Sequence, residues 1–312
     1  MCFNEEGADL TVLNGLNYTL EKGEILAVVG ESGCGKTMHA LSIMRLLPVG
    51  AIIKNGEIIF DGKDILKLPL KEMRHIRGAK IAMVFQDPMT SLNPVFTVQD
   101  QISETILAHK DVSKEEAEKS AVEILQKVGI NKKFAKCYPH QLSGGMLQRV
   151  MIAVALCCSP EILIADEPTT ALDVTVQAQI LELIKKLQKE NKMAVIFITH
   201  NLAIVDDIAT RVIVLYGGEK VEEAPKEELM TNPLHPYTKG LLGSIVTLQS
   251  RQTKLNAIPG APPLPGEQFK GCNFEPRCPF KMPKCKTCKP PVFMSRDNHQ
   301  VRCWMYEADN DE

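Results

Sequence analysis

The stretch GESGCGKT at residues 30–37 constrains the fold of this chain more than any other feature. It matches the pattern G-x-x-x-x-G-K-[S/T], whose glycines let backbone N–H groups curl around a polyphosphate. The apolar run GEILAVVG (23–30) precedes it, and TMHALSIMRLL follows with helical spacing. A buried strand, a glycine-rich turn and a helix in this order predict an α/β protein with a phosphate-binding loop. The loop consists of Gly30, Glu31, Ser32, Gly33, Cys34, Gly35, Lys36 and Thr37.

Further apolar runs of strand length alternate with helical patterns along the chain. EILIAD is followed by the amphipathic segment VTVQAQILELIKKLQKEN (174–191), and two more apolar runs come after it. Such alternation predicts a parallel sheet covered by helices on both faces. Residues 87–158 interrupt the alternation because they are largely helical, so we expect an inserted helical subdomain there. The expected strands lie at 23–30, 80–85, 161–166, 193–200 and 211–218.

Four side chains would supply the chemistry of a nucleotide site. Lys36 would place a positive charge on the β and γ oxygens of a triphosphate, and the Thr37 hydroxyl would meet Mg²⁺. Asp166, at the end of an apolar strand, offers the carboxylate that the metal needs. Glu167 is expected on the opposite side of that strand end, where a carboxylate can polarise an attacking water. Two solvated acids are the alternative interpretation of Asp166 and Glu167.

Gln86 and His200 also stand at the carboxyl ends of expected strands, the edge at which ligands bind in α/β sheets. The Gln86 amide oxygen can ligate Mg²⁺, and His200 is a candidate for a role in catalysis. A polar residue that only ends a strand is the alternative for Gln86, and a structural or surface histidine is the alternative for His200.

Composition excludes several classes of protein. The 312 residues carry a net charge of −2 and one Trp, which argues against recruitment of nucleic acid by a basic field or by stacking aromatics. No apolar run approaches the roughly 18 residues that span a bilayer, and the start lacks a signal-peptide pattern. We therefore expect the chain in the cytosol, where a partner would bring it to a membrane.

A second anion-binding feature lies more than a hundred residues after the glycine-rich loop. LSGGM (142–146) places a serine and two glycines at the start of a helix, whose free N–H groups and dipole favour an anion. A plain serine-capped helix is the alternative. Asp173 similarly precedes the helix expected at 174–191, where it would serve as an N-cap.

These segments, in this order, resemble the ATP-binding cassette (ABC) ATPases. The resemblance identifies Walker A at 30–37, the Q-loop at Gln86, the signature LSGGM at 142–146, Walker B at 162–167, the D-loop ALD at 171–173 and the switch histidine His200. It implies a RecA-like P-loop NTPase fold with N-terminal antiparallel β hairpins. It further implies ATP and Mg²⁺ as ligands, catalytic roles for Glu167, His200 and Gln86, and Mg²⁺ ligation by Thr37, Gln86 and Asp166.

In this family two cassettes share each nucleotide. The resemblance therefore implies action in trans, on the ATP bound by a partner cassette, by Ser143, Gly144, Gly145 and Asp173. It also implies an aromatic residue near the start that stacks on adenine, for which Phe3 is favoured by position over Tyr18. The chain begins almost directly at the expected hairpin, which is a short start for such a fold.

Several segments narrow the resemblance to the ATPase subunits of dipeptide and oligopeptide importers, with nickel importers as close relatives. They are QDPMTSLNP after Gln86, LSGGM, NPLHPYTKGLL (232–242) and a group of late cysteines. The implied partners are a second, non-identical ATPase subunit, two transmembrane permease subunits and an extracytoplasmic substrate-binding protein. The implied location is the cytoplasmic face of the plasma (inner) membrane, reached only through the permease. Leu147 departs from the pattern, because a basic residue usually follows the signature.

A soluble cassette ATPase of translation or DNA maintenance is the alternative from another class. Those chains typically carry two cassettes or long coiled-coil arms, and this sequence has one cassette and no arm. On the favoured interpretation, a nucleotide-binding domain occupies 1–246, and a linker with a small cysteine-rich module occupies 247–312.

Five of the ten cysteines crowd into 272–303, a stretch too small to build its own core. Four thiolates suit structural zinc and also a [4Fe–4S] cluster. Basic residues outnumber acidic ones around them, which would offset the charge of either centre, and without interleaved aromatics this surplus does not predict nucleic-acid binding. The resemblance to importer ATPases favours the cluster. The expected ligands are Cys272, Cys278, Cys285 and Cys303, with Cys288 as an alternative ligand that forms C-x-x-C with Cys285.

Overall fold

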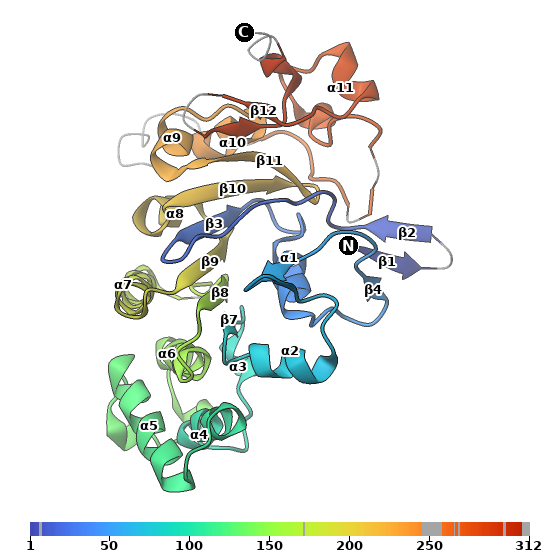
Figure 1. The fold of residues 1–312 in the computed structure, drawn as a ribbon. Coiled ribbons are helices and arrows are strands. Elements are labelled where there is room, and N and C mark those ends of the chain that lie inside the picture. Colours follow the sequence, from blue (N-terminus) through green and yellow to red (C-terminus); the bar gives the residue numbers. More distant parts are fainter. Residues whose placement is uncertain are drawn as a thin grey trace. The chain divides into compact units, whose positions relative to one another are not determined.

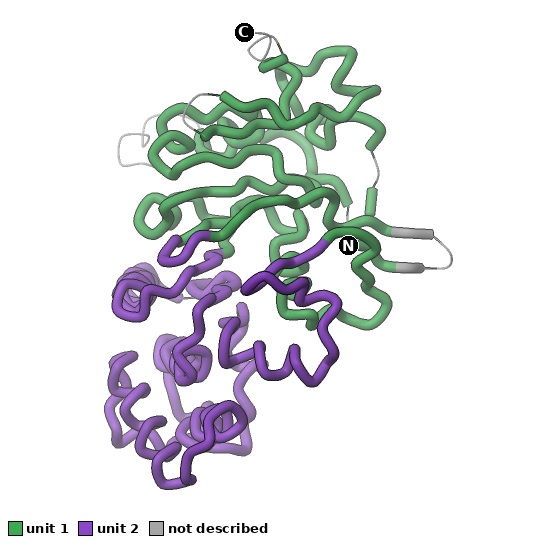
Figure 2. The backbone as a smooth tube through the Cα atoms, in the orientation of Figure 1, with its two compact units in different colours: residues 1–20, 25–56, 198–312 green, residues 21–24, 57–197 purple. Residues whose placement is uncertain are grey.

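The computed structural model describes residues 1–5, 8–170, 172–244, 258–264, 266–267, 269–295 and 298–307 (Figure 1). The chain forms two compact units (Figure 2). Unit 1 contains Met1–Leu20, Ile25–Gly56 and Ile198–Glu312. Unit 2 contains Glu21–Glu24 and Glu57–Phe197. Each unit is therefore assembled from segments that are distant in the sequence.

The sheet of unit 1 has the strand order β12-β13-β11-β10-β3. β3 (Ile25–Val29) is buried at every residue and runs parallel to β10 (Arg211–Tyr216). Because these strands are buried on both faces of the sheet, their sequences are nearly continuous apolar runs. β11 (Glu219–Pro225) then turns back antiparallel to β10 through Gly217 and Gly218, which both have positive φ.

The start of the chain forms a separate antiparallel sheet in unit 1. β1 (Cys2–Glu5) pairs with β2 (Ala8–Thr11) on one side and with β4 (Ala51–Ile52) on the other. The carbonyl of Met1 accepts hydrogen bonds from the N–H groups of Val12 and Leu13 at 3.0 and 3.1 Å. These strands confirm the expected antiparallel N-terminal elements.

The C-terminal part of unit 1 adds two strands to the main sheet. β13 (Gln300–Val301) pairs antiparallel with β11, and β12 (Phe293–Met294) pairs with β13. The cysteine-rich segment thus continues the sheet that carries β3. The other elements of unit 1 are α1 (Lys36–Met44), α8 (Leu202–Ile208), α9 (Lys226–Thr231), α10 (Pro236–Gly243), η4 (Glu275–Arg277), α11 (Pro283–Thr287) and η5 (Trp304–Tyr306).

Unit 2 contains the parallel pair β7 (Ile81–Val84) and β8 (Ile162–Asp166), with a short hairpin of β5 (Ile59–Phe60) and β6 (Lys63–Asp64). β9 (Ala194–Thr199) includes the point at which the two units divide. The helices and short 3₁₀ turns of unit 2 are α2 (Leu70–Ile76), α3 (Pro88–Ser91), α4 (Val98–His109), α5 (Lys114–Lys127), η1 (Lys132–Phe134), η2 (Pro139–Gln141), α6 (Gly144–Leu156) and α7 (Val174–Asn191).

The insertion expected at 87–158 is helical, and the structure describes all of it without a strand. Its clearest helix, α5, begins with a reciprocal capping box in which Ser113 and Glu116 bond to each other's backbone N–H. The five expected strands are found as β3, β7, β8, β9 and β10. The expected domain boundary at 246/247 lies outside the described residues. No helix among the described residues is long and apolar enough to cross a bilayer.

Candidate nucleotide site and cysteine pocket

The phosphate loop connects β3 to α1 in unit 1, and its glycines are required by geometry. Gly35 is the N-cap residue of α1 and has φ 102°. A Cβ there would lie 2.7 Å from Leu13 Cδ2, and a Cβ on Gly30 would lie 2.3 Å from the carbonyl oxygen of Leu215. These close neighbours leave room only for glycine at the two positions.

Lys36 lies folded onto the loop. Its Nζ donates to the carbonyl oxygens of Gly30 at 2.7 Å and Glu31 at 3.0 Å, and its side chain is buried. Thr37, in the first turn of α1, is exposed, as are Ser32 and Gly33. Exposed residues around the N-terminus of a nine-residue helix, next to a fixed ammonium, are suited to an anion.

Cys34 is another buried residue of the loop. Desolvation raises the pKa of its thiol, although the Lys36 ammonium opposes the shift. The side chain therefore stays neutral and acts as packing rather than as a nucleophile.

Gln86 and Glu167 meet in unit 2. The parallel register pairs Val84 of β7 with Ala165 of β8, so both side chains lie two positions beyond paired residues at the same end of the two strands. Gln86 Nε2 donates to Glu167 Oε2 at 3.1 Å, and Thr170 Oγ1 donates to the same oxygen at 2.9 Å. The structure thus brings together two of the three residues expected to act in catalysis.

Glu167 also has an unusual backbone, with φ 46°. A left-handed conformation is costly for a residue with a β-carbon, and such residues cluster at functional sites. The preceding Asp166 ends β8 and is 1% exposed. This burial argues against the alternative interpretation of Asp166 as a solvated acid.

His200 directly follows β9 and is exposed. The next residue, Asn201, accepts a hydrogen bond from Ala203 N–H at 3.0 Å and is the N-cap of α8. His200 therefore lies at a strand-to-helix turn in unit 1, the position that the sequence predicts.

The signature segment starts α6 as expected. Ser143 is the N-cap by backbone conformation, but its side chain makes no capping hydrogen bond, and Ser143 and Gly144 are exposed. Gly145 has a packing role, because a Cβ there would lie 2.7 Å from Val176 Cγ1 of α7. Leu147, which stands where a basic residue was expected, is 3% exposed and belongs to the buried face of α6.

Asp173 is the N-cap of α7, and its Oδ1 accepts a hydrogen bond from Val176 N–H at 2.9 Å. The capping interpretation is therefore confirmed, and the role in trans stays a prediction. Ala171, the first residue of the expected D-loop, lies outside the described residues.

The two aromatic candidates for adenine stacking differ. Tyr18 OH shares a hydrogen bond of 2.7 Å with His39 Nε2, and the two rings pack edge to face with centroids 5.5 Å apart. Burial raises the pKa of Tyr18. Phe3 is half-buried in β1, where it is paired with Leu10 and Ala51. Tyr18 therefore has a structural partner, and Phe3 remains the predicted stacking residue.

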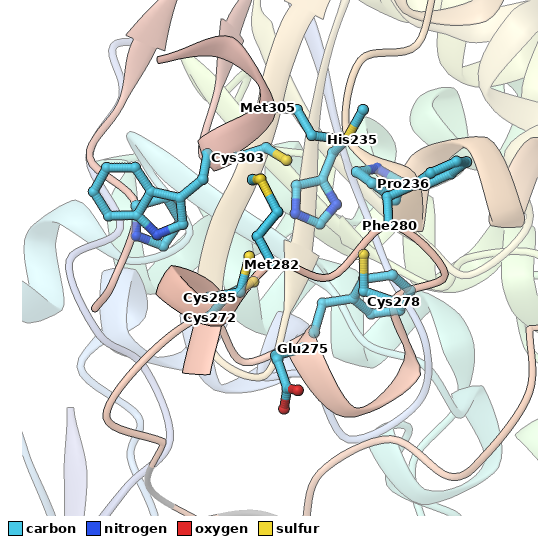
Figure 3. A pocket seen from close by; sticks show the side chains of 13 residues that line it. His235, Pro236, Cys272, Glu275, Cys278, Phe280, Met282, Cys285, Cys303 and Met305 are labelled. Atoms are coloured by element: carbon cyan, nitrogen blue, oxygen red, sulfur yellow. The ribbon is translucent and has the colours of Figure 1, made fainter. Parts of the chain in front are cut away.

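The four predicted cysteine ligands line one pocket in unit 1. Figure 3 shows their side chains around a common space, with the Glu275 carboxylate turned away from it. Other side chains around this cysteine pocket include His235, Phe280 and Met282. Among the described residues, no group of three or more His, Cys, Asp or Glu side chains is arranged to hold a metal ion. The expected iron–sulfur or zinc centre is therefore not shown.

Burial governs the chemistry of these thiols. It raises the pKa of Cys272 to about 12 and that of Cys303 to about 11, and it also raises the pKa of Cys278. All described cysteines are free thiols. Cys288 is exposed and does not line the pocket.

Sequence reasoning missed Arg277. This residue ends η4, directly before Cys278, and its guanidinium pairs with Glu31 of the phosphate loop at 2.6 and 3.0 Å. The only sequence signal was a basic residue beside a cysteine, which fits charge compensation at a thiolate centre equally well. A partner 246 residues away is not detectable from local pattern.

Comparison with known families gives two matches. The family model described as "ABC transporter" matches residues 13–170. The family model described as "Oligopeptide/dipeptide transporter, C-terminal region" matches residues 221–285. The second match overlaps the segment that contains α10, η4 and three of the cysteines of the pocket.

Curated relatives align along almost the whole chain. The dipeptide transport ATP-binding protein DppD of Bacillus subtilis (strain 168) is 48% identical over 308 residues, which cover 98% of this chain and 92% of the relative. The oligopeptide transport ATP-binding protein OppD of the same organism is 49% identical over 311 residues, which cover 98% and 87%.

Solved structures give the same family. The dimeric structure of a post-hydrolysis state of the ATP-binding cassette MJ0796 bound to ADP and Pi has 32% identity and a TM-score of 0.65. It covers 72% of this chain and 95% of its own. The structure of cbiO1 from Clostridium perfringens, part of the ABC transporter complex cbiONQ, has 28% identity and a TM-score of 0.64, and covers 74% and 88%.

Proposed function

The chain belongs to the ABC transporter family, and on that basis we propose that it is the ATP-hydrolysing subunit of an importer for dipeptides or oligopeptides. The observation that carries this proposal is the extent of the alignment. Relatives named for dipeptide and oligopeptide transport match both the cassette and the C-terminal region, over 98% of this chain. A shared cassette alone would indicate only the family.

ATP binding and hydrolysis assign a role to each of the predicted site residues. Lys36 and the amides of the phosphate loop hold the β and γ phosphates. Thr37, Gln86 and Asp166 supply oxygen ligands for Mg²⁺, which suits carboxylate, amide and hydroxyl oxygens. Phe3 stacks on the adenine.

Glu167 is the general base that polarises the attacking water. The hydrogen bond from Gln86 Nε2 supports this assignment, because it orients the carboxylate before substrate arrives and leaves the amide Oε1 for a metal. His200 contacts the γ-phosphate and reports its presence.

Two cassettes close around each nucleotide in a head-to-tail pair, and the second cassette is a non-identical subunit. Ser143, Gly144 and Gly145 contact the γ-phosphate bound by the partner, together with Asp173. Support comes from the exposed start of α6, where the serine side chain leaves the backbone N–H groups to another acceptor. The related cassette MJ0796 is described as dimeric with ADP and Pi.

Closure of the pair drives two transmembrane permease subunits between inward- and outward-facing states. An extracytoplasmic binding protein delivers the peptide, and the chain lies peripherally at the cytoplasmic face of the plasma (inner) membrane through the permease. Nucleic acid has no part in this cycle. Import of nickel or another small solute by the same architecture is the alternative, and a soluble ABC ATPase outside transport is a remote one.

Reconstitution tests the proposal. The chain, its second ATPase subunit and the two permease subunits are placed in proteoliposomes with ATP on the cassette side, and uptake of a labelled dipeptide, a labelled pentapeptide and ⁶³Ni²⁺ is measured with the binding protein present. Peptide uptake that stops without this chain supports the proposal. Nickel uptake alone would favour the alternative solute, and full ATPase activity of a strictly monomeric chain would contradict the shared-site mechanism.

We also propose that the cysteine pocket holds a [4Fe–4S] cluster on Cys272, Cys278, Cys285 and Cys303. The fit rests on the lining, since the four thiols surround one space whose other side chains are largely apolar. Zinc, which takes four thiolates at about 2.3 Å, is the alternative centre. When bound, the cluster would cross-link a segment with little core of its own.

The cluster is tested by anaerobic purification. A brown protein with iron and acid-labile sulfide in equal amounts supports it, and Cys278→Ser should remove both while Cys288→Ser leaves both in place. Stoichiometric zinc in place of iron would show that the pocket holds zinc and not the cluster. Absence of any metal would leave the four thiols as packing groups.

A further inference from the structure

Arg277 joins the cysteine pocket to the phosphate loop. Its guanidinium forms a two-point ion pair with Glu31, with Nη1 to Oε2 at 2.6 Å and Nη2 to Oε1 at 3.0 Å. The Arg277 side chain is 5% exposed and that of Glu31 is 26% exposed. A bidentate pair in such a setting is stronger and more directional than an exposed pair. Arg277 directly precedes Cys278, and Glu31 directly follows Gly30, so the pair connects the two sites.

The rest of the guanidinium is also engaged. Nε donates to the carbonyl oxygen of Pro259 at 3.0 Å, and Nη1 donates to Tyr216 OH at 3.3 Å. Every nitrogen of the guanidinium therefore has an acceptor. Because rotation of the side chain would break several of these bonds, Arg277 holds Glu31 in one place.

A second connection reaches the same loop residue. The backbone N–H of Glu31 donates to Tyr237 OH at 2.8 Å. The Tyr237 ring packs against Phe274 with centroids 5.5 Å apart, and Phe274 is 2% exposed. Phe274 lies between Cys272 and Cys278 in the sequence. The segment 272–278 therefore supports both the carboxylate and the amide of Glu31.

Glu31 in turn contacts the residue expected to bind phosphate. Its carbonyl oxygen accepts the 3.0 Å hydrogen bond from Lys36 Nζ. A displacement of Glu31 would move this acceptor and re-aim the ammonium. Without Arg277, the Glu31 carboxylate would also lie unpaired in a loop built to receive a triphosphate, and like charges at short range oppose binding.

We infer that Arg277 is a positioning residue for the phosphate loop. We also infer that Arg277 couples nucleotide affinity to the conformation of the cysteine pocket. The inference rests on the proposed ATP-binding function. It extends that function by making the C-terminal segment part of the nucleotide site. Coupling of this kind is reciprocal for equilibrium affinities, so a nucleotide and a ligand of the pocket must change each other's affinity by the same factor. A bound nucleotide is therefore also expected to alter the accessibility of the pocket thiols.

The first experiment is a double-mutant cycle on the full-length chain, read by the dissociation constant of a fluorescent ATP analogue with Mg²⁺. Arg277→Met should weaken binding by about tenfold or more, which is the effect of leaving a partly buried carboxylate unpaired. Glu31→Gln should weaken it less, and the double variant should bind like Glu31→Gln, because no charge remains for Arg277 to neutralise. Arg277→Lys, which keeps the charge without the fork, should fall between Arg277→Met and the wild type.

Lys289→Met is the matched control. Lys289 pairs with Glu219 and so also ties the C-terminal segment to β11, and its side-chain partners, Glu219 and Asn273, lie outside the phosphate loop. Its loss should leave nucleotide affinity unchanged. Equal affinities of wild type and Arg277→Met, with both folded by circular dichroism, would overturn the inference. Failure of the wild type to bind any nucleotide would instead overturn the proposed function.

The second experiment measures the reverse direction on metal-free protein. Alkylation of the pocket thiols by iodoacetamide is followed by mass spectrometry, with and without Mg²⁺-ATP. The nucleotide should change the alkylation rates of Cys272 and Cys278 in the wild type, and Arg277→Met should abolish this dependence. Rates that do not respond to nucleotide in the wild type would contradict the coupling.

Discussion

Gln86 and Glu167 share a hydrogen bond of 3.1 Å from amide Nε2 to carboxylate Oε2. The two residues lie 81 positions apart and are brought together by the parallel pairing of β7 and β8. The same carboxylate oxygen accepts the Thr170 hydroxyl at 2.9 Å. The proposed base is therefore oriented before any substrate arrives, and a predicted metal ligand does the orienting.

Glu167→Gln should separate nucleotide binding from hydrolysis. Glutamine keeps the size of the side chain and an oxygen that can accept from Thr170, but it cannot take a proton from water. Phosphate release by the paired cassettes should fall by about 100-fold or more, while the dissociation constant for Mg²⁺-ATP stays near that of the wild type. Thr170→Val, which keeps the carboxylate, is the control and should lose much less activity. Turnover by Glu167→Gln at the wild-type rate would remove Glu167 from its assigned role.

The two glycines of the signature should respond differently to alanine. A Cβ on Gly145 would lie 2.7 Å from Val176 Cγ1, and the β-branched valine has little rotamer freedom with which to withdraw. Gly145→Ala should lower the free energy of unfolding by about 1–3 kcal/mol. Gly144→Ala meets only Leu172 at 3.8 Å and should be close to neutral. Denaturant titration followed by circular dichroism measures both, and equal stability of the two variants would disprove the packing role.

Asp173 has a demonstrated capping bond and a predicted role in trans, and two substitutions distinguish them. Asp173→Ala removes the cap and should lower the free energy of unfolding by about 1 kcal/mol. Asp173→Asn retains a side-chain oxygen for Val176 N–H, so its stability should match the wild type. ATP turnover of the cassette pair should fall in both variants. Full turnover by Asp173→Asn would leave only the capping role.

The buried imidazole of His39 should make stability depend on pH. Desolvation lowers the pKa of His39 to about 4, below the value of about 6.5 in an unfolded chain. As the pH falls from 6.5 to 4, the unfolded state takes up a proton that the folded state refuses, so the free energy of unfolding decreases. The loss is on the order of 3 kcal/mol across this window, and His39 adds no pH dependence above it.

Urea titrations at pH values of about 7.5, 6, 5 and 4 measure this effect, with His39→Leu as the comparison. The variant also loses the partner of Tyr18 OH, so its absolute stability is lower. The informative quantity is the change with pH, which should be smaller in the variant. Parallel curves for the two proteins would show that His39 does not titrate differently on folding.

Local pattern was sufficient for the elements that carry the site. The strand at 23–30, the glycines of the loop and the helix behind it depend on residues adjacent in the chain, and they are found as β3, the loop and α1. The serine and aspartate that begin α6 and α7 were likewise predictable, because N-caps act within three residues. The order of these motifs along the chain was by itself enough to indicate the ABC family, which the relatives confirm.

The tertiary structure alone decided the contacts between distant segments. Three features depend on which surfaces meet: the pairing of β13 with β11, the burial of Leu147 on α6, and the Arg277–Glu31 ion pair. Short strands and single charges do not specify them locally. The sequence predicted which four cysteines would act as ligands. Only the fold shows that the four line one pocket and that Cys288 does not. Capping hydrogen bonds and intrinsic propensities act over a few residues, whereas the burial of a charge or a thiol is a property of the whole fold.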